Sequence, residues 1–145
     1  MTRVDFHFNA PDRLQYGCRL VRKIHRSGAR ILVWCEDPVA LAQFDSLLWT
    51  FSQLDFIPHA VASDPDHVRA ASPLLLTETL QGAPHRQVLL NLGVQVPAGF
   101  EQFERLIEVV SLDDEDRALA RSRWKQYTDQ GYAITRHDLA LKGSN

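Results

Sequence analysis

The stretch that decides the fold is Arg30-Ile31-Leu32-Val33-Trp34-Cys35-Glu36-Asp37-Pro38. Its unbroken apolar run is typical of a strand that is buried on both faces, as in a parallel sheet. The run ends at Glu36, and Asp37 can cap a helix whose first position is Pro38. A buried strand is therefore followed by a helix after a very short connection.

The same order precedes this stretch. Residues 4–8 (Val-Asp-Phe-His-Phe) alternate as a strand does, and Pro11 marks the start of a helix that ends near Ser27-Gly28. Strand, helix, strand and helix with short connections are typical of a Rossmann-like α/β fold. We expect a single domain over residues 1–145, with three layers, a mostly parallel central sheet and helices on both faces.

Further elements are expected along the rest of the chain. They are a short strand at Phe56-Ile57 stopped by Pro58, an exposed loop over 63–72, buried strands at 74–76 and 88–92, a short helix over 100–103, a strand over 106–110 and a long last helix. That helix is expected to open at Ser111, with Ser111 and Asp114 as a capping box, and to end near Gly131.

Composition limits the classes of function. The net charge is −2 and the sequence pI is about 6.3, which argues against broad nucleic-acid binding through clustered cations. Cys18 and Cys35 have no metal-ligand spacing and suit a reducing compartment. No apolar stretch is long enough to span a membrane, and the N-terminus lacks a secretory signal. We expect a cytoplasmic protein.

Motifs for catalysis and cofactor binding are missing. The turn after the first strand, residues 9–13, has no glycine, and neither G-x-G-x-x-G nor G-x-x-x-x-G-K-[ST] occurs. No histidine pair has zinc-ligand spacing, and G-x-S-x-G is absent. We therefore expect no cofactor, metal or catalytic residue. An alternative hypothesis is a small α/β enzyme with a site around Glu36, Asp37 and His7, because functional groups often follow such strands.

One segment is strongly basic. Residues 117–136 carry five positive charges and one negative charge, a balance of +4 in an acidic protein. Arg117, Arg121 and Lys125 recur every four residues, and Trp124 follows Arg121 by three, so all four share one side of a helix. Such a face can bind an acidic peptide. The alternative is a solvated face whose charges pair with residues 113–116.

A second feature is rich in aromatic residues. Residues 47–51 (Leu-Leu-Trp-Thr-Phe) are followed by Phe56, Ile57, Pro58 and His59. They predict either an apolar patch that receives a partner subunit or a loop packed on its own core.

Four stretches together resemble the chi subunit family of bacterial DNA polymerase III. They are residues 4–8, Cys35-Glu36-Asp37, Leu48-Trp49 through Phe56-Ile57-Pro58-His59, and Ala120-Arg121-Ser122-Arg123-Trp124-Lys125-Gln126-Tyr127. The resemblance implies a non-catalytic accessory subunit of the replicase, with a Rossmann-like fold and no nucleotide chemistry. It also implies two partners: the psi subunit of the clamp loader, and the acidic C-terminal tail of single-stranded-DNA-binding protein, which ends in Pro-Phe. DNA would be contacted only indirectly.

The resemblance also implies two sites, carried over by position. In the tail site, Arg121 and Lys125 would bind carboxylates, Trp124 would form a pocket wall, Arg117 would flank them, and Tyr127 belongs to the same segment. The psi surface would use Trp49, Phe56, Pro58 and His59. Two positions depart from the family pattern: Trp124 stands where a tyrosine can occur, and Thr128 where a basic residue can, which would weaken the electrostatic part of binding.

Overall fold

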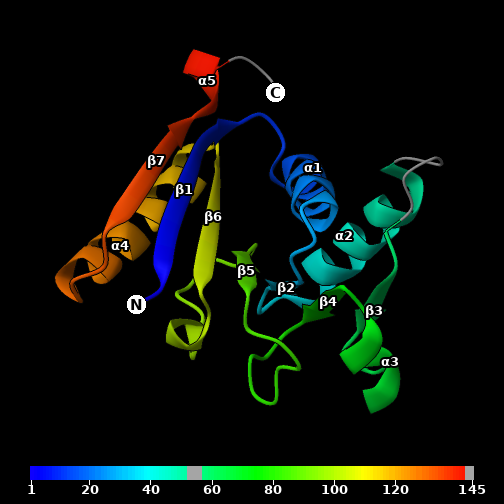
Figure 1. Cartoon of the computed structure of the whole chain (residues 1–145). Coiled ribbons are helices and arrows are strands. Elements are labelled where there is room, and N and C mark those ends of the chain that lie inside the picture. The colour runs from blue at the N-terminus through cyan, green and yellow to red at the C-terminus, as the bar shows by residue number, and fades with distance from the viewer. Residues whose placement is uncertain (52–56, 143–145) are drawn as a thin grey trace.

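The computed structural model describes residues 1–51 and 57–142, and its strands form one seven-stranded sheet (Figure 1). The elements in chain order are β1 (Arg3–Ala10), α1 (Arg13–Arg26), β2 (Ile31–Trp34), α2 (Pro38–Phe51), β3 (His59–Val61), α3 (Asp66–Ala71), β4 (Leu74–Thr77), β5 (Val88–Asn91), the 3-10 helix η1 (Phe100–Gln102), β6 (Arg105–Ser111), α4 (Asp114–Asp129), β7 (Ile134–Asp138) and α5 (Leu139–Lys142). The strand order is β3-β4-β2-β5-β6-β1-β7, and neighbouring strands are parallel.

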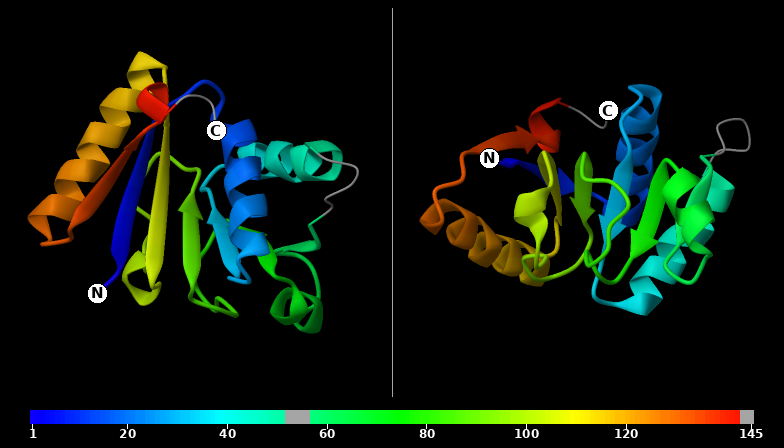
Figure 2. Two further views of the ribbon diagram at one scale, coloured as in Figure 1. Left: turned by 45° about the horizontal axis from the view of Figure 1, so that its top comes forward. Right: turned by 60° about the horizontal axis from the view of Figure 1, so that its bottom comes forward.

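Helices cover both faces of this sheet (Figure 2). α1 and α2 pack on one face with Ile31 and Val33 of β2, whereas α4 and η1 pack on the other face with Leu32. Successive strand residues point to opposite faces, so a continuous apolar run such as β2 contributes to both cores. The predicted three-layer α/β fold is confirmed. No helix within residues 1–51 and 57–142 is long and apolar enough to cross a membrane.

Two predicted segments differ from the structure between α2 and β4. The strand lies after Pro58, at His59–Val61, where pairing with β4 begins; Phe56 is outside the described residues. The segment 63–72, expected to be an exposed loop, contains the short helix α3. Pro65 sets the start of α3, and Arg69 stabilises it by donating to Asp66 one turn back, with a separation of 3.4 Å.

Two helices begin later than predicted. Asp12, rather than Pro11, opens α1, because its side chain accepts a hydrogen bond from the backbone N–H of Gln15. Asp113 caps α4 by accepting from the N–H of Asp116, so the Ser111 capping box is wrong. At α2 the prediction is confirmed, since Asp37 accepts from the N–H of Val39 at 3.0 Å.

β7 was not predicted, and it determines the shape of the candidate site. β6 and β7 lie on either side of β1, so the crossover between them carries α4 over β1. β7 is thereby left at the outer edge of the sheet, beside the helix that carries the basic segment.

Candidate protein-binding surfaces

α4 is held to the sheet by a buried polar network. Arg123 donates from Nε to Oε1 of Glu108 on β6 at 3.0 Å, and both side chains are almost completely buried. Tyr127 donates its hydroxyl to Oε2 of Glu108 at 2.6 Å, and the Asn91 amide donates to the same oxygen at 3.0 Å. Arg123 also donates to the carbonyl of Val94. These bonds fix which side of α4 faces solvent.

Burial sets the electrostatics of this network. Loss of water raises the pKa of Glu108, while the charge of Arg123 and the donated hydrogen bonds oppose that rise. Burial beside the same carboxyl also raises the pKa of Tyr127, so its phenol remains a hydrogen-bond donor. A buried carboxyl with a cation and two further donors is well satisfied, whereas loss of any one partner would be costly.

The neighbouring flank of α4, turned toward β1 and β7, forms one wall of a groove of about 560 Å³. Residues from β1, β6, α4 and β7 line it: Phe8, Asn9, Val110, Arg117, Arg121, Trp124, Arg136 and Asp138. The groove thus combines three arginines with aromatic surface, and Asp138 supplies the carboxylate in this lining.

Tilted aromatic rings in contact with one another form the floor of the groove. The centre of the Trp124 ring lies 5.0 Å from the centre of the Phe6 ring and 5.8 Å from that of the Phe8 ring. Trp124 is half-buried, so part of its indole remains accessible to an apolar side chain. Such partly exposed aromatic surface is typical of sites that accept an apolar anchor.

The groove arginines have no ion-pair partner of their own among the described residues. Within the described part of the chain, Arg117, Arg121 and Arg136 have no carboxylate at ion-pair distance. Arg105, in contrast, pairs with Asp5, and the buried Arg123 pairs with Glu108. Three arginines around aromatic rings, without a carboxylate of their own, can accept carboxylates from another molecule.

The structure brings together some of the predicted tail-site residues and separates others. Arg117, Arg121 and Trp124 line the groove. Lys125 does not belong to this lining; its ammonium lies 3.2 Å from Asp129 on the exposed surface of α4. Tyr127 is fully buried beneath the helix, so its expected contact with a peptide is replaced by support of α4 through Glu108.

Burial also corrects the charge balance of the basic segment. Arg123 is one of its five cations but is only 1% exposed and is neutralised by Glu108. The sequence pattern counted Arg136 as the last cation of the basic segment but did not place it among the tail-site residues; it lines the groove from β7. The sequence gives little signal for this strand, because Ile134 is the one apolar residue of Ile134-Thr135-Arg136-His137-Asp138.

The predicted psi surface lies around the end of α2. Trp49 is 61% exposed, and its ring meets the ring of His59 edge-on, with centroids 5.6 Å apart. His59 is held by Asp45 at 2.6 Å and by the carbonyl of Ile57 at 2.8 Å, and its side chain is only 2% exposed. Pro58 is exposed. Trp49 and Pro58 can therefore contact a partner, while His59 supports Trp49.

The residues of the alternative enzyme hypothesis are committed to separate contacts. Glu36 accepts from the backbone N–H groups of Val94 at 2.9 Å and Gln95 at 3.3 Å, and Asp37 caps α2. Nδ1 of His7 lies 2.6 Å from the hydroxyl of Tyr16, and the His7 ring stacks on the ring of His137. These contacts hold loops and helix ends in place, which favours a structural role for each residue.

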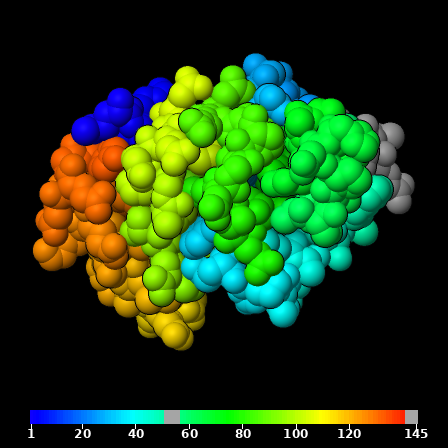
Figure 3. Space-filling model, turned by 90° about the horizontal axis from the view of Figure 1, so that it is seen from below, coloured from blue at the N-terminus to red at the C-terminus, as the bar shows by residue number. Residues whose placement is uncertain are grey.

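The two candidate surfaces lie at opposite ends of the sheet. β7 and α4 are at one edge and β3 and α2 are at the other, and Figure 3 shows these segments on opposite sides of the molecule. One partner on the groove would therefore leave the Trp49 surface accessible to a second partner.

Fold and groove together define an α/β domain of Rossmann-like layering that lacks a phosphate loop and presents a basic, aromatic groove. The family model described as "DNA polymerase III chi subunit, HolC" matches residues 1–135. The chain belongs to this family, so it is a replication accessory subunit, as the resemblance implied. Membership in a polymerase-subunit family favours the adaptor hypothesis over the enzyme hypothesis.

Relatives in three bacteria are described as DNA polymerase III subunit chi. The one from Pseudomonas aeruginosa is 34% identical over 143 residues, which cover 96% of this chain and 98% of the relative. The one from Haemophilus influenzae is 26% identical over 126 residues, or 86% of each chain. The one from Escherichia coli is 27% identical over 121 residues, which cover 83% of this chain and 81% of the relative.

Proposed function

We propose that this chain is a non-catalytic adaptor that links the clamp loader, through a psi subunit, to the acidic C-terminal tail of single-stranded-DNA-binding protein during DNA replication. The observation that carries the proposal is the groove, in which Arg117, Arg121 and Arg136 surround aromatic rings without carboxylate partners among the described residues. Membership in the chi family supports a role in replication.

The spacing of the helix cations suits an extended acidic peptide. Arg117 and Arg121 are four residues apart, which corresponds to about 6 Å along a helix. Alternate side chains of an extended peptide, which point the same way, are about 7 Å apart. Two acidic side chains of the tail can therefore each reach a guanidinium, while an apolar residue at the end of the tail rests on Trp124.

The second half of the proposal concerns the psi subunit and rests on the exposed end of α2. An indole that is 61% exposed, beside the exposed Pro58, is the kind of aromatic anchor that subunit interfaces use. Replacing Trp49 by alanine should abolish co-purification with a psi subunit while tail binding is retained. Unchanged co-purification would contradict this part of the proposal.

Peptide titration tests the tail-binding half. A fluorescent acidic peptide ending in Pro-Phe should bind the wild type, and binding should weaken with salt because exposed charge pairs are screened. An Arg117→Ala/Arg121→Ala variant should lose roughly a hundredfold or more in affinity, since each of the two charged hydrogen bonds contributes about 1.5–3 kcal/mol.

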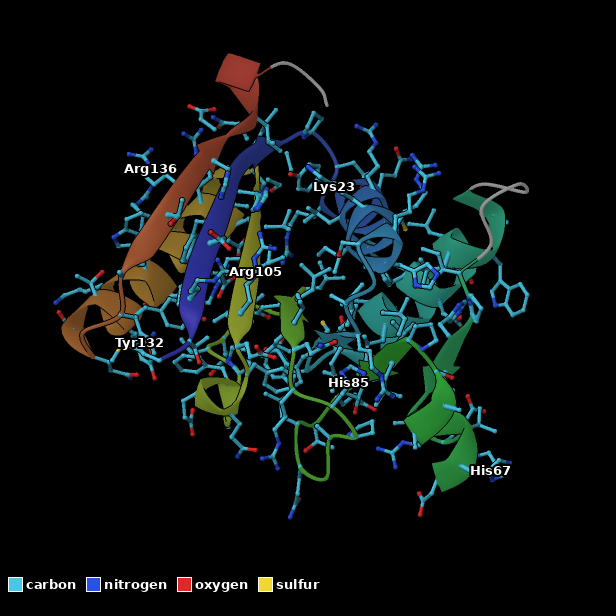
Figure 4. All side chains as sticks on the ribbon, in the orientation of Figure 1. Lys23, His67, His85, Arg105, Tyr132 and Arg136 are labelled. Atoms are coloured by element: carbon cyan, nitrogen blue, oxygen red, sulfur yellow. The ribbon has the colours of Figure 1, made fainter. Side chains whose placement is uncertain are left out.

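Matched controls separate the groove from general charge. A Lys23→Ala/Arg86→Ala variant removes two exposed cations that do not line the groove, one on α1 and one in the segment before β5 (Figure 4 labels Lys23). This variant should bind the peptide nearly as well as the wild type. Equal losses in both variants, or no binding at low salt, would overturn the proposal. Tighter binding of single-stranded DNA than of the peptide would point instead to direct DNA contact.

A further inference from the structure

The groove has a second wall, and β7 provides it. Ile134 and Arg136 of β7 lie in register with Val4 and Phe6 of β1. Val4, Phe6 and Ile134 pack into the core on the α4 side, so Arg136, two residues after Ile134, projects toward the same side. Figure 4 shows Arg136 extending from this outer strand of the sheet.

Arg136 sits on the aromatic floor of the groove. Its guanidinium carbon lies 5.2 Å from the centre of the Phe8 ring and 6.0 Å from that of Trp124. Ring faces attract a cation at these distances, and stacking is especially favourable for the planar guanidinium. A guanidinium held over ring faces by cation–π attraction keeps N–H groups for an incoming acceptor. None of the carboxylates in the described part of the chain pairs with Arg136.

We infer that Arg136 is a specificity-determining residue that binds the free C-terminal carboxylate of the docked peptide, an inference that rests on the proposed function of the groove. An apolar terminal side chain on Phe8 and Trp124 brings its own α-carboxylate within a few ångströms of the rings, because one carbon separates the two groups. The cation that lies over those same rings is Arg136.

The division of roles follows from distance along the peptide. A side-chain carboxylate two residues before the terminus lies about 7 Å away from it. Arg121 and Arg117, on the helix wall, are placed for such upstream acidic side chains. Thr128 stands where the family pattern can have a basic residue, so no cation comes from that position; its hydroxyl donates to the carbonyl of Trp124. Arg136 supplies a cation to the groove from β7. The family match ends at residue 135 and does not extend to Arg136.

A double-variant cycle between protein and peptide tests the inference. The acidic Pro-Phe peptide is compared as the free acid and as the C-terminal amide, each labelled at its N-terminus. We expect amidation to weaken wild-type binding by about tenfold, as loss of a charge-assisted hydrogen-bond pair does. In Arg136→Ala, acid and amide should differ by about twofold or less. Arg136→Lys keeps the charge but loses the paired N–H donors of the guanidinium. Its ratio of amide to acid dissociation constants should lie between those of the wild type and Arg136→Ala.

Lys23→Ala is the matched control, since it removes one exposed cation outside the groove lining and should preserve the tenfold ratio. Arg136 is exposed, so melting temperatures of its variants should match the wild type. If Arg136→Ala weakens binding of the free-acid peptide and of the amide equally, the inference is wrong, while the groove is still supported as the tail site. If the wild type binds neither peptide, the proposed function itself fails.

Discussion

Nε of Arg123, in the middle of α4, lies 3.0 Å from Oε1 of Glu108, in the middle of β6, and water reaches neither side chain. This pair determines which residues of α4 face the groove. Because the neighbouring flank of the helix then carries Arg117, Arg121 and Trp124, the binding surface depends on a contact that lies beneath the helix.

Removing the cation from this pair should destabilise the fold. Arg123→Met leaves Glu108 buried without its charged partner, which costs about 3–5 kcal/mol of unfolding free energy. A double variant, Arg123→Met/Glu108→Gln, should recover part of this loss because no unpaired charge remains. Urea denaturation measures both values. A single variant within about 1 kcal/mol of the wild type would show that the pair does not anchor α4.

Asp138 should weaken binding of an acidic peptide. Its carboxylate lines the groove, where it accepts from the amide of Asn9 at 2.8 Å and from the N–H of Ala140 at 3.0 Å. Asp138→Asn keeps an oxygen for the Ala140 N–H and removes the charge. We expect severalfold tighter peptide binding at low salt and a smaller gain at high salt. Unchanged affinity at low salt would contradict this placement of the charge.

His85 should make the fold sensitive to mild acid. Burial, with a smaller contribution from Arg30, lowers its pKa to about 4, so it is neutral in the folded state. In the unfolded state His85 has a pKa near 6.5, so it takes up a proton there first as pH falls. The contribution of neutral His85 to stability is therefore present above pH 6.5 and is lost as pH falls toward 4. Between pH 7 and pH 5, protonation of His85 in the unfolded state lowers the free energy of unfolding by about 2 kcal/mol.

The matched variant for this prediction is His85→Leu, which is expected to show a shallower fall in stability between pH 7 and pH 5. Denaturant titrations at the two pH values give the comparison. Identical pH dependence in wild type and variant would mean that His85 is not the group responsible.

Both cysteines should resist thiol reagents in the native protein. Burial is the main cause that raises the pKa of Cys18 to about 12, and it also raises the pKa of Cys35. At pH 8 the thiolate fraction of Cys18 is then roughly a thousandfold below that of an ordinary cysteine. Labelling with a chromogenic disulfide should be slow until denaturant is added, after which two thiols should react. Fast native labelling would contradict the burial of these side chains.

The parts of the fold that sequence patterns predicted are those set by neighbouring residues. The apolar run of β2 and the Asp37 cap of α2 are local features, and the structure contains both. β7 is different, because its place beside β1 results from the α4 crossover and from pairing with residues more than a hundred positions away. Its largely polar sequence gives little indication of that pairing.

The candidate site was predicted as far as helical periodicity allows. Spacing alone places Arg117, Arg121 and Trp124 together, since they share one helix. The burial of Arg123 depends on Glu108, which interrupts the apolar strand Leu106-Ile107-Glu108-Val109-Val110. A carboxylate in such a strand requires a cationic or hydrogen-bonding partner, but only the structure shows which residue supplies it. Arg136 was inaccessible to this reasoning because it reaches the groove from another element.

The tail-binding surface can be observed directly through the three tryptophans, each of which gives one indole N–H signal in a nitrogen–proton NMR correlation spectrum. Trp34 is buried and donates to the carbonyl of Glu78, Trp49 lies on the predicted psi surface, and Trp124 lines the groove. Titration with the acidic Pro-Phe peptide should shift the Trp124 signal and leave those of Trp34 and Trp49 in place. A shift of Trp49 with Trp124 unmoved would contradict the assignment of the tail to the groove.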